Sequence, residues 1–177
     1  MNQRNIKFGI ALYFITMLLF FGLLFIFSTR GEMSEAQYFN YSVIICCFVL
    51  PLLYAIVGLY NVYLSVCEQP LGRRSIWKLS FLPMFTGGLL SLATIFIFFD
   101  TTGSWAEDSL QRGWYELMTS NPNPEFMEKN GELVNAMTDL NINMFSLKVF
   151  FISFSVILFF YFLISSIFAI FLKNRRL

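Results

Sequence analysis

Histidine is absent from this chain of 177 residues, and charged residues are scarce. The lack of histidine removes the commonest general base, the commonest metal ligand and the usual pH switch. Asp, Glu, Lys and Arg make up 13% of the chain, whereas about a quarter is usual for a soluble domain. The net charge of +1 provides no basic field for nucleic acid. We therefore expect neither a nucleic-acid partner nor a soluble fold.

Cysteine is almost as rare, with Cys46, Cys47 and Cys67 as the only three. A disulfide between the adjacent Cys46 and Cys47 would be strained, and a zinc site needs four convergent ligands. We expect the cysteines to be small buried hydrophobic residues. No metal and no cofactor is expected.

Apolar residues dominate instead, at 57% of the chain, with 23 Phe and a mean hydropathy of +0.65. Four apolar runs cover Ile6–Phe27, Tyr41–Cys67, Ile76–Phe99 and Ser146–Leu172. At about 1.5 Å per residue, each helix spans a hydrocarbon core of roughly 30 Å. The first run is too long for a usual signal peptide, so we expect it to be retained. The sequence predicts an all-α integral membrane protein, a single domain over residues 1–177 with a bundle of four transmembrane helices.

Basic residues gather on one side of the expected membrane. The segments on that side hold one acid, Glu68, and eight of the twelve basic residues: Arg4, Lys7, Arg73, Arg74, Lys78, Lys173, Arg175 and Arg176. Ten of the eleven acids lie on the other side. The basic side faces the cytoplasm under the positive-inside rule. We expect both termini in the cytoplasm and the loop 100–145 on the outer face.

Two groups of residues are candidates for binding lipid or neighbouring helices. Proline should kink a membrane helix, and small residues let helices approach closely. The candidate packing residues are Pro51, Gly58, Pro83, Gly87, Gly88 and Ser91; a hinge in a moving transporter helix is the alternative. Basic residues at the cytoplasmic boundary would attract anionic headgroups at about 1 kcal/mol each. The alternative is that these residues only determine the membrane topology. These candidate lipid contacts are Arg73, Arg74, Lys78, Lys173, Arg175 and Arg176.

The loop 100–145 is expected to hold two amphipathic helices. The first begins at a capping box, Ser104-x-x-Glu107, and the second follows Asn121-Pro-Asn-Pro124. Such helices can lie on the bilayer, cap the bundle or bind a partner. A row of acids on the second helix is expected to be a solvated face rather than a cation site. The candidate partner surface is Trp105, Trp114, Phe126, Leu133 and Met137.

Several short motifs resemble the domain-of-unknown-function 4199 family, small inner-membrane proteins of certain Gram-negative bacteria. They are Gly58-Leu-Tyr-Asn-Val-Tyr63 before a short basic loop, Gly87-Gly88, Pro124-Glu-Phe-Met-Glu-Lys129 and the basic tail. The fourth span lacks the acid that the family often has there. The resemblance implies a bacterial inner-membrane location and therefore a periplasmic loop 100–145. It also implies a membrane partner of a polyprenol-phosphate glycosyltransferase as one role.

Three classes of function remain open. The first is a non-catalytic subunit, scaffold or anchor of a larger membrane assembly; across the classes, the expected partner is a membrane protein or another copy of this chain. A small oligomeric transporter or channel is the second, although intramembrane ionisable residues usually mark ion pathways and the span interiors lack them. A membrane enzyme is the third, with Asp100, Glu68 and the inner arginines as its only available groups. Because no acid–base pair or nucleophile motif accompanies them, we expect a protein that binds and does not catalyse.

Overall fold

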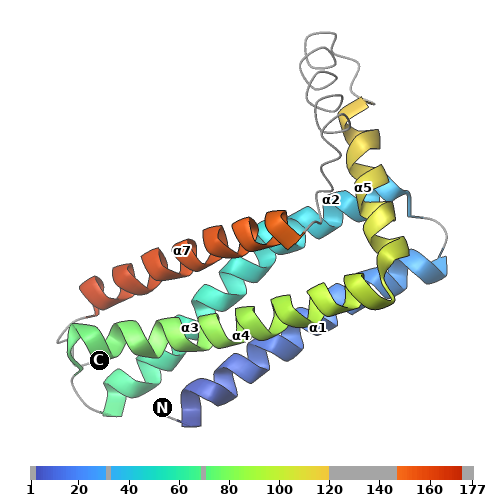
Figure 1. Ribbon diagram of the computed structural model, residues 1–177. Coiled ribbons are helices and arrows are strands. Elements are labelled where there is room, and N and C mark those ends of the chain that lie inside the picture. The colour runs from blue at the N-terminus through green and yellow to red at the C-terminus, as the bar shows by residue number, and fades with distance from the viewer. Residues whose placement is uncertain (1–2, 31–32, 69–70, 120–146, 173–177) are drawn as a thin grey trace.

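The computed structural model describes residues 3–30, 33–68, 71–119 and 147–172, which are almost entirely helical (Figure 1). About 95% of the described residues are helical, and the described ranges contain no strand. Four helices are long and apolar enough to cross a membrane: Gln3–Thr29, Glu35–Cys67, Arg73–Thr101 and Phe151–Phe171. The predicted all-α membrane fold with four spans is confirmed.

The second span is built from three pieces, while the first and third are unbroken helices. In chain order the elements are α1 (Gln3–Arg30), α2 (Glu35–Ile44), η1 (Ile45–Val49), α3 (Leu50–Glu68), α4 (Arg73–Thr101), α5 (Ser104–Thr119) and α7 (Leu147–Phe171). The predicted second helix of the loop, with Phe126, Leu133 and Met137, lies outside the described residues, as do Lys173, Arg175 and Arg176.

The second span begins at Glu35, six residues before the predicted start at Tyr41. Its first turn is closed by a capping box that the sequence reading missed. The hydroxyl of Ser34 accepts from the N–H of Gln37 at 3.2 Å, and the Gln37 side chain accepts from the N–H of Ser34 at 3.1 Å. Because both orphan donors are satisfied, the helix starts well before the apolar run does.

The expected kink at Pro51 takes the form of a π-helical segment, η1, just before it. The N–H of Leu50 bonds to the carbonyl of Ile45, five residues back. Proline has no N–H, and its ring clashes with the carbonyl four residues earlier. A wider turn relieves that clash. Figure 1 shows the span changing direction between α2 and α3.

The expectation that the cysteines are buried was wrong, because Cys46, Cys47 and Cys67 are all exposed on the second span. Large apolar side chains are exposed in the same way; Phe14 is 64% exposed, Leu18 73% and Phe48 70%. In a bilayer the surroundings are apolar, so such side chains need no protein cover. Exposure on these spans is therefore what a helix surrounded by lipid would show.

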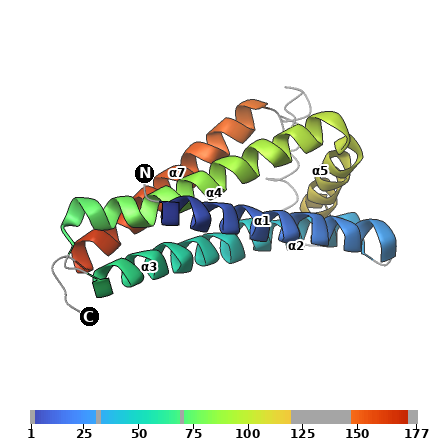
Figure 2. The ribbon, with the colours of Figure 1, turned by 90° about the horizontal axis from the view of Figure 1, so that it is seen from below.

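Helix α4 packs against each of the other three spans (Figure 2). Its closest approach is to α1, where two glycines face each other. A Cβ on Gly9 would overlap the hydroxyl of Thr86, and a Cβ on Gly87 would lie 2.9 Å from the carbonyl oxygen of Gly9. Small residues at such a crossing let two backbones touch. Gly9 is a packing residue that the sequence reading did not include.

Three small clusters of buried side chains follow one another along the bundle. The cluster nearest α5 is Leu24, Tyr38, Ala106 and Leu110. The middle cluster is Leu12, Tyr54, Met84 and Tyr161. The third is Val62, Val66, Ile76 and Ala169. The first cluster contains residues of α1, α2 and α5, whereas α3 and α7 contribute to the other two. We call the end of the bundle that carries α5 the α5 end.

Candidate functional site

Buried hydroxyl groups meet in the middle cluster, at the centre of the bundle. The hydroxyl of Thr16 donates to the carbonyl of Leu12 at 2.9 Å. It lies 3.0 Å from the hydroxyl of Tyr54, which is 3.5 Å from that of Ser91. Because the Thr16 hydroxyl donates its proton to the carbonyl of Leu12, it accepts a hydrogen bond from the hydroxyl of Tyr54. The chain of bonds ends at a backbone carbonyl and locks α1, α3 and α4 together.

The candidate packing residues of the spans gather around Tyr54. Gly87 and Gly88 of α4 lie beside it, and the Tyr161 ring of α7 stacks on it at 5.2 Å between centroids. Gly58, one turn further along α3, faces the side chain of Met84. Pro83 is buried inside α4, which continues through it as one helix. Gly58, Gly87 and Gly88 thus lie where the spans approach one another closely.

A second polar cluster lies near the opposite end of the bundle. The amide nitrogen of Asn61 donates to the side-chain oxygen of Asn5 at 2.9 Å and to the carbonyl of Leu79 at 2.6 Å. The guanidinium of Arg4 donates to the hydroxyl of Ser65. Both asparagines are buried, at 0% and 5% exposure. The cluster ties the beginning of α1 to α3 and α4, and its polar side chains replace bonds that lipid cannot offer.

Three candidate lipid-binding residues fall within the described part of the chain. Arg73, Arg74 and Lys78 are exposed on the first two turns of α4. They lie at the end of the bundle where α1 begins (Figure 1). Their geometry suits loose attraction to anionic lipid.

An apolar depression of about 450 Å³ lies along one face of α7. It is lined by Phe151, Ile152, Ser155, Val156 and Phe159. The hydroxyl of Ser155, its one polar side chain, donates to the carbonyl of Phe151 at 2.9 Å. The lining therefore offers no polar side chain to bind a polar ligand, and its apolar surface suits lipid chains.

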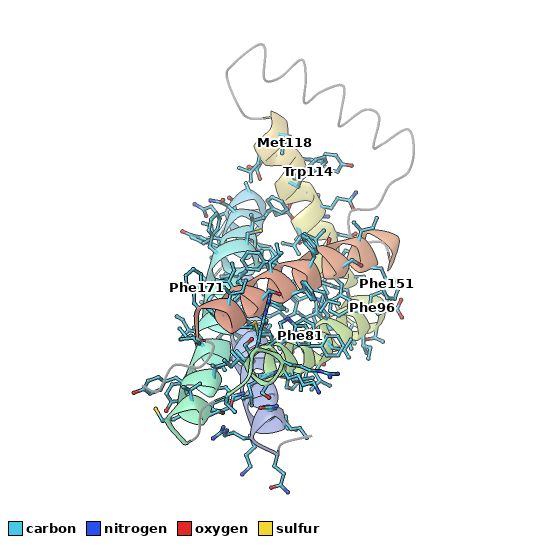
Figure 3. The ribbon with its side chains drawn as sticks, turned by 90° about the vertical axis from the view of Figure 1, so that its left-hand side faces the viewer. Phe81, Phe96, Trp114, Met118, Phe151 and Phe171 are labelled. Atoms are coloured by element: carbon cyan, nitrogen blue, oxygen red, sulfur yellow. The ribbon has the colours of Figure 1, made fainter. Side chains whose placement is uncertain are left out.

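Helix α5 crosses the direction of the spans and packs on the first turns of α2. Figure 1 shows this crossing, and Figure 3 shows α5 projecting beyond the spans with Met118 near its far end. Ala106 and Leu110 are buried against Tyr38 of α2, whose ring stacks on Phe27 of α1 at 4.3 Å. The chain thus builds a platform at the α5 end, which we define as α2 together with α5.

The closest contact within the platform is between two backbones. Gly113 of α5 faces the carbonyl of Glu35, and a Cβ there would overlap the carbonyl oxygen and lie 2.5 Å from its carbon. Any residue other than glycine must therefore push the helices apart. Ala106, Leu110 and Gly113 are spaced so that they share one face of the helix. That spacing is the signal in the sequence that could have indicated this close approach.

Polar contacts surround the glycine contact. The Nε of Arg112 donates to both carboxylate oxygens of Glu35, at 2.9 and 3.0 Å. These hydrogen bonds and the charge of Glu35 raise the pKa of Arg112. The Glu116 carboxylate accepts from the N–H of Ala36 at 3.2 Å and so caps α2 from α5. Exposed ion pairs contribute little to stability. The burial of apolar side chains and the close glycine contact therefore account for most of the stability of α5 docked on α2.

The candidate partner residues on α5 differ in exposure. Trp105 is 45% exposed, whereas Trp114 is only 5% exposed and is not available to a partner in this arrangement. The helix begins at Ser104. The carbonyl of Gly103 accepts from the N–H groups of Ala106 and Glu107, at 2.9 and 3.1 Å. Gly103 therefore occupies the N-cap position.

In the described ranges, no three His, Cys, Asp or Glu side chains come together to hold a metal ion. Asp100 and Glu107, the acids nearest the end of α4, are separated by the turn at Thr102 and Gly103. The arrangement can hold another molecule against the platform or against the spans.

No curated protein and no solved structure matches this chain. One family model does match, over residues 7–174, and its description is "Protein of unknown function (DUF4199)". The match covers all four spans and the segment between the third and fourth, and it confirms the resemblance seen in the sequence. The chain belongs to the DUF4199 family.

Proposed function

We propose that the protein is a non-catalytic subunit or scaffold of a larger assembly in the bacterial inner membrane. In this proposal the platform binds the partner. The observation that carries it is the backbone contact of Gly113 with Glu35. A helix that only lay on lipid would need no such contact, whereas a fixed binding surface does, because preorganisation lowers the cost of association.

The exposed side of the platform suits a partner with basic side chains. Trp105 and Asp108 are both exposed and lie three residues apart on α5, which places them on one face. An aromatic ring and a carboxylate together favour Arg or Lys, through cation–π and ionic contacts. Aromatic residues are also frequent at interfaces.

The proposed orientation has both termini in the cytoplasm and α5 in the periplasm. The support is the charge distribution: Arg73, Arg74 and Lys78 begin α4, and Asp100 ends it. A chain with its three cysteines changed to alanine can carry Gly72→Cys or Ser104→Cys. A membrane-impermeant thiol reagent is expected to label only Ser104→Cys in spheroplasts. Labelling of Gly72→Cys alone would mean the opposite orientation.

Purification of the tagged protein from its own membranes in mild detergent, followed by mass spectrometry, tests the subunit proposal. We expect a stoichiometric membrane protein with the wild-type chain and its loss with Trp105→Ala. Leu18→Ala, which shortens the most exposed lipid-facing leucine, is the control and should retain it. A polyprenol-phosphate glycosyltransferase as that protein would identify the role implied by the family resemblance. A chain that purifies alone, or in copies of itself, would contradict the proposal and favour the small transporter or channel, which flux into proteoliposomes would reveal.

A further inference from the structure

The second span contains a weak point between two well-anchored parts. None of the five residues of η1 is buried, and only Ile45 and Val49 are half-buried, so little side-chain packing holds this segment in place. Its backbone hydrogen bonds join residues that are five apart, as in a π-helix. Pro51 lies two residues after the end of η1. Kinks in helices occur at such π segments and at proline. The span can change its angle here at a smaller cost than elsewhere, because few buried contacts are lost.

The part of the span on the α5 side of η1, which is α2, is bound to α5. Arg112 and Glu116 of α5 bind Glu35 and Ala36 of α2, and Gly113 fixes the distance between the backbones. Contacts between α2 and α1 are apolar, through the stacked rings of Tyr38 and Phe27. Apolar contacts are not directional, so this pair can slide where the hydrogen-bonded platform cannot.

The joints of the platform with the rest of the described chain are not continuous α-helix. Helix α2 begins afresh at the Ser34 cap, and η1 interrupts it on the other side. Helix α5 is separated from α4 by Thr102 and Gly103. On the inner side of η1, by contrast, α3 is locked by Tyr54 and Asn61 to α1 and α4. The fold thus joins the platform to the bundle through η1 and through the apolar cluster that Tyr38 shares with Leu24 of α1.

We propose that η1 and Pro51 form a hinge about which the platform tilts relative to α3. The hinge requires only residues of this chain and does not depend on the proposed partner. With a partner bound to the platform, the same tilt would link the position of the partner to the packing at the centre of the bundle.

Distances between pairs of spin labels, measured by double electron–electron resonance in nanodiscs, test the hinge. The hinge pair uses Asn40→Cys and the native Cys67, both exposed, with Cys46 and Cys47 changed to alanine. The control pair is Lys78→Cys with Ile97→Cys on α4, in a chain without native cysteines. A second control pair lies inside the platform, at Asn40→Cys and Asp108→Cys. We expect a broad distance distribution for the hinge pair and narrow ones for both controls.

Pro51→Leu restores the missing N–H and removes the ring. It should narrow the hinge-pair distribution to the width of the α4 pair and leave the α4 pair unchanged. A wild-type hinge pair as narrow as the α4 pair would overturn the proposal whether or not the variant folds. A broad distribution within the platform would overturn it as well, because the platform would then not be rigid. So would a Pro51→Leu chain with an intact α4 pair and an unchanged hinge pair.

Discussion

Gly113→Ala is expected to release α5 from α2. The added methyl group would overlap the carbonyl of Glu35, and a backbone atom cannot rotate away as a side chain can. Overpacking of this kind costs about 1–3 kcal/mol. A loss of that size raises the population of undocked α5 by about 5- to 150-fold. The ion pair of Arg112 with Glu35 is lost at the same time.

Tryptic cleavage after Arg112, in protein held in nanodiscs, measures this release, because cleavage requires local unfolding of the helix. The rate should rise in Gly113→Ala and stay at the wild-type value in Gly22→Ala, where a Cβ meets nothing within 4 Å. Equal rates in the two variants would show that α5 is not held by the glycine contact.

Gly87→Ala is expected to destabilise the bundle far more than the same change at the next residue. A Cβ on Gly87 would lie 2.8 Å from the Cβ of Leu12 and 2.9 Å from the carbonyl oxygen of Gly9. Two helices must therefore move apart, at a cost of about 1–3 kcal/mol. The hydroxyl bonds of Tyr54 to Thr16 and Ser91 cross the same junction and would lengthen with it.

Gly88→Ala is the matched control. The new Cβ would lie 3.6 Å from the ring of Tyr161 and 3.8 Å from that of Tyr54, which is ordinary contact. Alanine is also the better helix former, by up to about 1 kcal/mol in water. Unfolding by titration with dodecyl sulfate should show Gly88→Ala at or above wild-type stability and Gly87→Ala well below it. The reverse order would show that α1 and α4 do not cross at Gly87.

The four spans could be predicted from the sequence because only length and apolar composition decide whether a helix can cross a bilayer. Their ends could not be predicted, since α2 starts at a cap that lies outside the apolar run. The cysteines illustrate a second limit: an apolar side chain in a soluble protein is usually buried, whereas on a span lipid covers it.

The platform could be predicted only in part. The pattern of Ala106 and Leu110 indicates a helix with one apolar face, and that helix is present. Its position on α2 depends on partners far apart in the chain, since Arg112 and Glu35 are 77 residues apart. The π form of the bend near Pro51 likewise depends on how the preceding turn relieves the proline ring. Sequence patterns carry local structure, and these features are set by packing.

The most direct test of the platform as a binding surface is to compare the wild-type chain, Gly113→Ala and Gly22→Ala in the native purification with mass spectrometry. The account predicts one stoichiometric partner with the wild type and with Gly22→Ala, and a partner that is lost or much reduced with Gly113→Ala, in membranes where all three chains are equally abundant. Equal recovery of the partner from the three chains would contradict the central claim, because binding would then not depend on the docked position of α5.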